Sequence, residues 1–157
     1  MKRTFLLLPA VLLAGCQMFT YQPPSGEDTA TVVFTGNAAA QPVVCVPGRG
    51  FKDTKTSLAV KPWDTNAFDE LFSAMKKAEQ VPVPVAADGQ TRIGVVYNER
   101  NDNMRRDHCR VAVQFNAQPG ARYQAHFTRT VAGQCGLEVR GEEGVQADTV
   151  PVDWDCP

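Results

Sequence analysis

Alternation of apolar and polar residues is the dominant pattern in this chain of 157 residues. The clearest case is residues 110–115, in which Val111, Val113 and Phe115 share one face of an extended strand. Similar short strands are expected at residues 31–35, 91–97, 121–128 and 137–139, and the β-branched run at residues 42–46 predicts one more. The alternation predicts a mainly β protein, an antiparallel β-sandwich whose sheets each pack one face on a core.

The segment Gln118 to Ala121 separates the two best predicted strands. Pro119 presets φ near −65° at the first central position of a turn, and Gly120 accepts the positive φ that a type II turn requires at the second. We therefore expect a type II turn that joins residues 110–115 and 121–128 as a hairpin.

Residues 81–85 read Val-Pro-Val-Pro-Val. Because Pro82 and Pro84 lack an N–H group, this run cannot be a central strand, and we expect an edge strand or an extended connection. Asp88 and Gly89 then predict a turn into the next strand.

One amphipathic helix is predicted to interrupt the strands, from Thr65 to about Gln80. Its large apolar residues recur with i, i+3, i+4 and i+7 spacing, and they are Phe68, Leu71, Phe72 and Met75. Such a stripe is typical of a helix packed on a core. The acidic Asp69 and Glu70 disfavour a helix that lies on a bilayer.

The N-terminus has the features of a secretory signal. Lys2 and Arg3 precede the apolar residues 4–13, which are too few to span a bilayer, and small residues follow. The segment Leu13 to Cys16 resembles the lipobox of bacterial lipoproteins. The resemblance implies that residues 1–15 are a signal peptide and that Cys16 is acylated and becomes the new N-terminus.

Acylation has consequences for location. Each buried CH2 of an acyl chain contributes about 0.8 kcal/mol, so two or three chains would hold the protein on a membrane almost permanently. Within the resemblance, Gln17 after the cysteine favours the outer membrane over the inner one. Residues 16–28 are polar and rich in proline and glycine. They predict a flexible tether that spans roughly 40 Å when extended, ahead of a single β-sandwich domain over residues 29–157.

The net charge of the mature chain bears on which classes of partner it can bind. The whole chain has 16 basic and 17 acidic residues, and removal of residues 1–15 takes away two basic ones, so the mature chain has 14 against 17, a formal charge of −3. This disfavours nucleic acid as a partner, because there is no basic excess to neutralise phosphates.

Four cysteines remain beyond Cys16, at positions 45, 109, 135 and 156. An even number in an oxidising compartment predicts two disulfides, and three connectivities are open. Their spacings of 64, 26 and 21 residues contain no Cys-x-x-Cys pair, which disfavours zinc. We expect neither a metal nor a cofactor.

Few residues suit catalysis. None of the three serines lies in a Gly-x-Ser-x-Gly elbow, and two histidines are too few for a zinc triad. His108 is next to Cys109, but neighbours on a strand point to opposite faces, and an oxidised cysteine is no nucleophile. His126 alternates with Phe127 and is expected to face solvent.

Two clusters of charge are candidates for contacts. Residues 98–107 read NERNDNMRRD and predict a ten-residue polar loop. This loop is either a solvated hairpin loop of balanced charge or a candidate interaction loop, with Arg100, Arg105 and Arg106 as its contact residues. Arg49, between two glycines, is a further candidate contact to an anionic group. The acidic residues near the C-terminus have no calcium-loop spacing and are expected to be ordinary surface, and they are Glu142, Glu143, Asp148, Asp153 and Asp155.

The run from Cys109 to Val139, with Pro119, Gly120 and Tyr123 inside it, resembles a pattern in small, uncharacterised bacterial envelope lipoproteins with a β-sandwich fold. The resemblance implies that Cys109 pairs with Cys135, which leaves Cys45 for Cys156. A regular three-strand meander would place positions 109 and 135 about 10 Å apart, whereas a disulfide needs Cα atoms within about 7 Å. Pairing of Cys45 with Cys109 and of Cys135 with Cys156 therefore stays open.

Two classes of function follow. The first is a non-enzymatic binding or structural module, held at the membrane by its acyl chains, which contacts another envelope protein; an inhibitor or immunity protein against a periplasmic toxin is a special case. The alternative is a small envelope hydrolase that cleaves cell-wall material with paired carboxylates such as Asp69 and Glu70. Such acids must converge across a cleft, whereas neighbours on a helix diverge.

Overall fold

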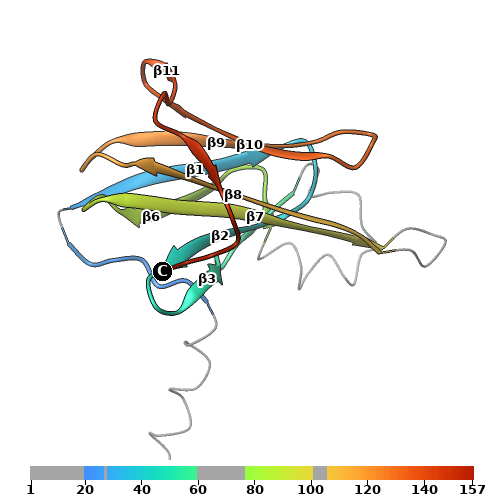
Figure 1. Ribbon diagram of the computed structural model, residues 1–157, viewed down its shortest axis with the longest axis horizontal. Helices are drawn as coiled ribbons and strands as arrows, with labels where there is room; N and C mark the ends of the chain where they lie inside the picture. The colour runs from blue at the N-terminus through green and yellow to red at the C-terminus, as the bar shows by residue number, and fades with distance from the viewer. Residues whose placement is uncertain (1–19, 27, 60–76, 101–105) are drawn as a thin grey trace, which may run out of the picture.

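The computed structural model describes residues 20–26, 28–59, 77–100 and 106–157, and these form two sheets of five strands packed face to face (Figure 1). The first sheet has the order β11-β10-β9-β1-β6. Its strands are β1 (Thr29–Gly36), β6 (Val81–Ala86), β9 (Arg122–Arg129), β10 (Cys135–Gly141) and β11 (Gly144–Val145). The second sheet has the order β12-β8-β7-β2-β3. Its strands are β2 (Gln41–Val46), β3 (Gly50–Asp53), β7 (Gln90–Arg100), β8 (Arg106–Asn116) and β12 (Val150–Val152).

The strand pairs of both sheets are antiparallel except for β1 with β9. A short parallel pair, β4 (Ser57–Leu58) with β5 (Lys77–Ala78), lies beside them. The mainly β class and the two disulfides are confirmed. Within the described ranges, no helix has the length and apolar character needed to cross a membrane.

The core lies between the sheets and follows the predicted alternation. Val113 and Phe115 of β8 are buried, as are Ile93 and Val95 of β7 and Phe127 of β9. Burial of each such side chain contributes about 1.5–3 kcal/mol, so the inward positions of the strands dominate the stability of the fold.

The turn at residues 118–121 is present, but the predicted hairpin is wrong. The Ala121 N–H donates to the Gln118 carbonyl at 3.1 Å, and Gly120 has a φ of 76°. However, β8 pairs with β7 in the second sheet and β9 pairs with β1 in the first. The reason lies in β1. The Thr31 N–H donates to the Ala121 carbonyl, so the chain pairs with β1 directly after the turn. The turn therefore carries the chain from one sheet to the other.

The proline-rich run is an edge strand, which was one of the two structures expected for it. β6 lies at the border of the first sheet, and among the described strands it pairs with β1 alone. Val83 and Val85 are buried, whereas Pro82 and Pro84 are exposed. Since the missing N–H groups recur at alternate positions, β6 can share a full ladder with one neighbour only.

The predicted helix over residues 65–80 lies mostly outside the described residues. Its last part is not helical, because Lys77 and Ala78 form β5 and the next two residues form a bend before β6. Parallel pairing with Ser57 and Leu58 of β4 holds the backbone of Lys77 and Ala78 extended.

The folded domain begins earlier than residue 29, inside the expected tether. Thr20 forms a bridge with Asp53, and Tyr21 is only 6% exposed. The Tyr21 hydroxyl donates to the Pro84 carbonyl at 2.9 Å, and burial raises the pKa of Tyr21 to about 12. Tyr21 thus closes the side of the sandwich between β3 and β6.

The C-terminal segment is bound to the outer face of the second sheet. Cys156 forms a disulfide with Cys45 of β2, and the Trp154 ring stacks on Phe51 with centroids 4.4 Å apart. Gly94 allows this close approach, because a Cβ at that position would lie 2.8 Å from the Val111 carbonyl oxygen and 3.1 Å from Trp154.

Candidate interaction site at one end of the sandwich

The β7–β8 and β9–β10 hairpins reach the same end of the molecule (Figure 1). The predicted polar loop at residues 98–107 is wrong in its extent, because β7 continues to Arg100 and β8 begins at Arg106. Cross-strand pairing holds both segments extended, as far as Arg100 opposite Arg106. Residues 101–105 lie outside the described part of the chain.

A disulfide joins the two sheets at this end. Cys109 of β8 and Cys135 of β10 are bonded, with Cα atoms 6.4 Å apart. Both cysteines continue the inward positions of their strands, Cys109 in line with Val111 and Cys135 in line with Leu137. The pairing is the one that the resemblance implies. The meander that argued against it does not exist, because β8 and β9 belong to different sheets and no strand intervenes.

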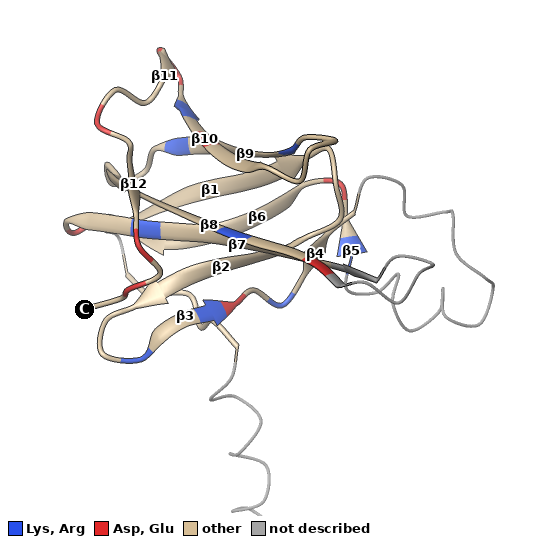
Figure 2. Cartoon of the chain, turned by 45° about the vertical axis from the view of Figure 1, so that its right-hand side comes forward, with Lys and Arg blue, Asp and Glu red and all other residues tan. Residues whose placement is uncertain are grey.

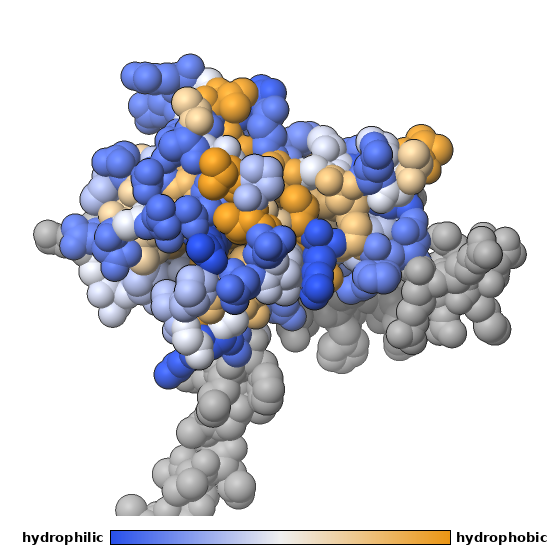
Figure 3. All heavy atoms as spheres, viewed as in Figure 1, coloured by the Kyte–Doolittle hydropathy of each residue, from blue (hydrophilic) through white to orange (hydrophobic). Residues whose placement is uncertain are grey.

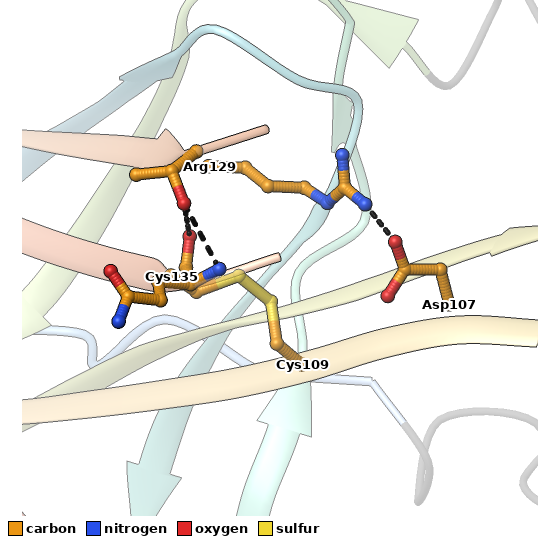
Figure 4. A network of polar contacts seen from close by, with 6 residues as sticks. Asp107, Cys109, Arg129 and Cys135 are labelled. Carbon is orange, nitrogen blue, oxygen red and sulfur yellow. Dashed lines mark hydrogen bonds and ion pairs between the residues drawn. A yellow bond between two sulfur atoms is a disulfide. The ribbon is translucent and has the colours of Figure 1, made fainter. Parts of the chain in front are cut away.

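An ion pair also crosses between the sheets, next to the disulfide (Figure 4). Arg129 at the end of β9 donates from its guanidinium to the Asp107 carboxylate at the start of β8. Their side chains are only 22% and 32% exposed. The guanidinium carbon lies 4.6 Å from the centroid of the Tyr97 ring, which is a cation–π geometry. The Arg129 Nε is buried without a hydrogen-bond partner among the described residues.

Asn37 fixes the end of β9 to the segment that follows β1. Its Oδ1 accepts from the Arg129 N–H at 2.8 Å, and its Nδ2 donates to the Arg129 carbonyl at 3.0 Å. A hollow of about 320 Å³ opens beside this contact, and its walls are Asn37, Ala38, Ala39, Tyr97, Asn98 and Arg129. A cation, an aromatic ring and two amides thus meet at the base of the two hairpins.

The β9–β10 turn adds an apolar tip to this end. Val131 is fully exposed, at 105%, and apolar spheres mark the end of this hairpin in Figure 3. The Thr130 hydroxyl accepts from the Gln134 N–H at 3.1 Å and so closes the turn. A closed turn holds Val131 in a defined place at the end of the β9–β10 hairpin.

Arg129, Asn37 and Tyr97 are not predicted from the sequence as parts of a site. Arg129 carries a readable signal, because it continues the inward positions of Tyr123 and Phe127, and a charged residue at an inward position needs a partner. Nothing in the sequence distinguishes Asn37, which acts through the backbone of a strand 92 residues away.

The four arginines singled out from the sequence do not form one group. Arg49 lies in the turn between β2 and β3, at the opposite end of the sandwich, since β2 runs antiparallel to β7. Arg100 and Arg106 lie at the end of the β7–β8 hairpin, and their side chains, like the whole of Arg105, lie outside the described part of the structure.

The outer face of the first sheet carries a larger, shallower hollow of about 420 Å³. Its polar lining includes Arg122, Gln124 and Arg140, and Arg140 forms an ion pair with Glu138. His126 faces outward here, as predicted, and its Nδ1 shares a hydrogen bond of 3.0 Å with the Thr35 hydroxyl. This hollow has no buried charged group that would define a ligand.

The remaining candidates show no shared site. Asp148 accepts a hydrogen bond from the Asn116 N–H at 2.8 Å, which lowers the pKa of Asp148. The described residues contain no group of three or more potential metal ligands. Asp69, Glu70 and Cys16 lie outside the described ranges.

The comparisons with known proteins add no family. No protein-family model matches the sequence, and no curated protein matches it at a significant level.

Proposed function

We propose that this protein is a lipoprotein of the bacterial cell envelope that acts as a non-enzymatic binding module. Acyl chains on Cys16 hold it in the outer membrane, and its domain faces the periplasm. The signal sequence of residues 1–15 and the lipobox-like segment that ends at Cys16 support this anchor. Two disulfides agree with an oxidising compartment.

We assign partner binding to the end that carries the β7–β8 and β9–β10 hairpins. This assignment rests on two links between the sheets. They are the disulfide between Cys109 and Cys135 and the ion pair between Asp107 and Arg129. Binding residues are typically placed on loops that a rigid scaffold supports. The two links supply that support at Asp107 and Cys109 of β8, within four residues of Arg105 and Arg106 in the sequence. The partner is another envelope protein, and inhibition of a periplasmic toxin is a special case of this function.

Site-specific crosslinking tests the assignment with a matched pair of positions. A photo-crosslinking amino acid replaces Val131 at the proposed site or Val145 on β11, at the opposite end of β10. Both valines are exposed, at 105% and 61%. We expect a specific adduct in intact envelopes from position 131 and none from position 145. The adduct should weaken when Arg105 and Arg106 are replaced by glutamine, and equal adducts from both valines would refute the assignment.

A further inference from the structure

The N-terminal segment joins the domain at one particular edge. Thr20 forms a parallel bridge with Asp53 of β3, and the Tyr21 N–H donates to the Asp53 carbonyl at 2.8 Å. Tyr21 then packs into the core between β3 and β6. From Thr20 onward the chain is therefore fixed to β3, the edge strand of the second sheet.

This attachment limits how far the domain can stand from its anchor. Cys16 precedes Thr20 by four residues, and an extended chain spans at most about 3.6 Å per residue, so their Cα atoms are within about 14 Å of each other. The tether expected from the sequence, residues 16–28, would allow roughly 40 Å. With acyl chains on Cys16, the β3 edge is held close to the bilayer surface.

The same edge is rich in positive charge (Figure 2). Arg49, Lys52 and Lys55 lie within seven residues, in β3 and the segments that flank it. Arg49 and Lys55 are exposed and Lys52 is half-buried, and none of the three forms an ion pair with another described residue. Lys52 lies opposite Val44, whose side chain points into the core, so the two side chains share the inner face of the sheet. The Lys52 ammonium must therefore extend past the edge of β3 to reach water.

Three acidic residues lie near this edge, and one of them, Asp53, belongs to the segment of residues 49–55 that carries the three basic ones. Asp53 is exposed between Lys52 and Lys55. Asp153 and Asp155 flank Trp154 on the outer face of the second sheet, where Trp154 covers Phe51. The mature chain as a whole is negative, so positive charge gathered at the anchored edge is a local feature and not a consequence of composition.

We propose that Arg49, Lys52 and Lys55, the basic edge, bind the headgroups of anionic phospholipids in the bilayer that holds the acyl chains. The inference rests on the proposed anchor at Cys16. The short connection brings the basic edge to the surface, and charge complementarity selects anionic lipid as its occupant. In a sheet, the strands run at right angles to the direction in which they are ordered. With the edge strand β3 facing the bilayer, the strands therefore run along the membrane, and so do the two hairpins of the candidate interaction site.

Lysine labelling of the acylated protein tests the proposal. The protein is reconstituted in vesicles of phosphatidylcholine alone or of an equal mixture with phosphatidylglycerol, and an amine-reactive reagent is applied with peptide mass spectrometry as the readout. We expect labelling of Lys52 and Lys55 to slow about fivefold on anionic vesicles, the factor that corresponds to about 1 kcal/mol per basic residue near such a surface. The labelling rate of each lysine on vesicles of phosphatidylcholine alone serves as its reference. The protection should disappear in about 1 M salt, where the Debye length is about 3 Å.

A matched pair of variants adds a second readout. Arg49→Gln should reduce the protection of both lysines, whereas Arg122→Gln, an exposed arginine on the other sheet, should not. Equal labelling on the two kinds of vesicle, or protection that survives high salt, would overturn the basic edge while leaving the anchor intact. Failure of the protein to float with either kind of vesicle would instead overturn the anchor itself, and the inference with it.

Discussion

The ion pair between Asp107 and Arg129 is expected to stabilise the fold by more than a surface pair does. Exposed pairs contribute about 0.2–1 kcal/mol, and hydrogen bonds to charged groups about 1.5–3 kcal/mol. With side chains 22% and 32% exposed, the Arg129–Asp107 pair lies between these classes. We therefore expect a coupling free energy of about 1–2 kcal/mol.

Asp107→Asn and Arg129→Met are expected to lower the free energy of unfolding by different amounts. Among the described residues, Asp107→Asn leaves the Arg129 guanidinium without a counter-charge, with a buried Nε that has no hydrogen-bond partner and with the Tyr97 ring beside it. This loss should lower the free energy of unfolding by about 2–3 kcal/mol. Arg129→Met keeps the apolar stem and leaves a carboxylate that water can reach, so it should cost about 1–2 kcal/mol.

A double-mutant cycle, followed by urea denaturation, measures the coupling free energy between Asp107 and Arg129. The double variant should be about 1–2 kcal/mol more stable than the sum of the single losses predicts. The pair of Arg140 with Glu138, at 56% and 46% exposed, provides a control cycle in which we expect a coupling below about 0.5 kcal/mol. Additive losses at Asp107 and Arg129, within about 0.3–0.5 kcal/mol, would refute the reasoning.

Three further predictions follow from the packing. Gly94→Ala should lower the free energy of unfolding by about 1–3 kcal/mol, because its Cβ would lie 2.8 Å from a backbone carbonyl, whereas Gly89→Ala, with open space around it, should stay within about 0.5 kcal/mol by urea denaturation. Tyr21 has a pKa of about 12 in the folded state against 10.0 when unfolded, so stability should fall as pH rises from 10 towards 12, and Tyr21→Phe should remove both this loss and the late phase of the ultraviolet tyrosine titration. Replacement of Cys109 and Cys135 by alanine opens a loop of 26 residues and should cost about 3.5 kcal/mol, and a loss below about 1 kcal/mol would contradict the role of this link.

The elements that depend on local pattern could be predicted from the sequence. Residues 110–115 lie within β8 with the expected inward face, and the proline-rich run is an edge strand because its missing N–H groups lie at alternate positions. The turn with Gly120 was equally readable, since it depends only on the φ values of two residues.

The elements that depend on contacts distant in sequence could not be predicted. Whether the strand after Gly120 returns beside β8 or crosses to the other sheet is decided by β1, which lies about 90 residues earlier. Tyr21 joins the core because β3 and β6 leave a gap that its ring fills, and nothing in the polar residues around it indicates such a gap. Of the candidate site, the charged hairpin was visible in the sequence. The link to Arg129 was not, because it needs the pairing of strands in two different sheets.

The anchor at Cys16 is the claim from which both the proposed function and the basic edge follow, and intact-mass analysis of the protein purified from its native envelope tests it most directly. The account predicts a chain that begins at Cys16, lacks residues 1–15, has a blocked amino group and carries the added mass of two or three acyl chains. A chain with a free, unmodified N-terminus, recovered in the fluid released by osmotic shock, would contradict it.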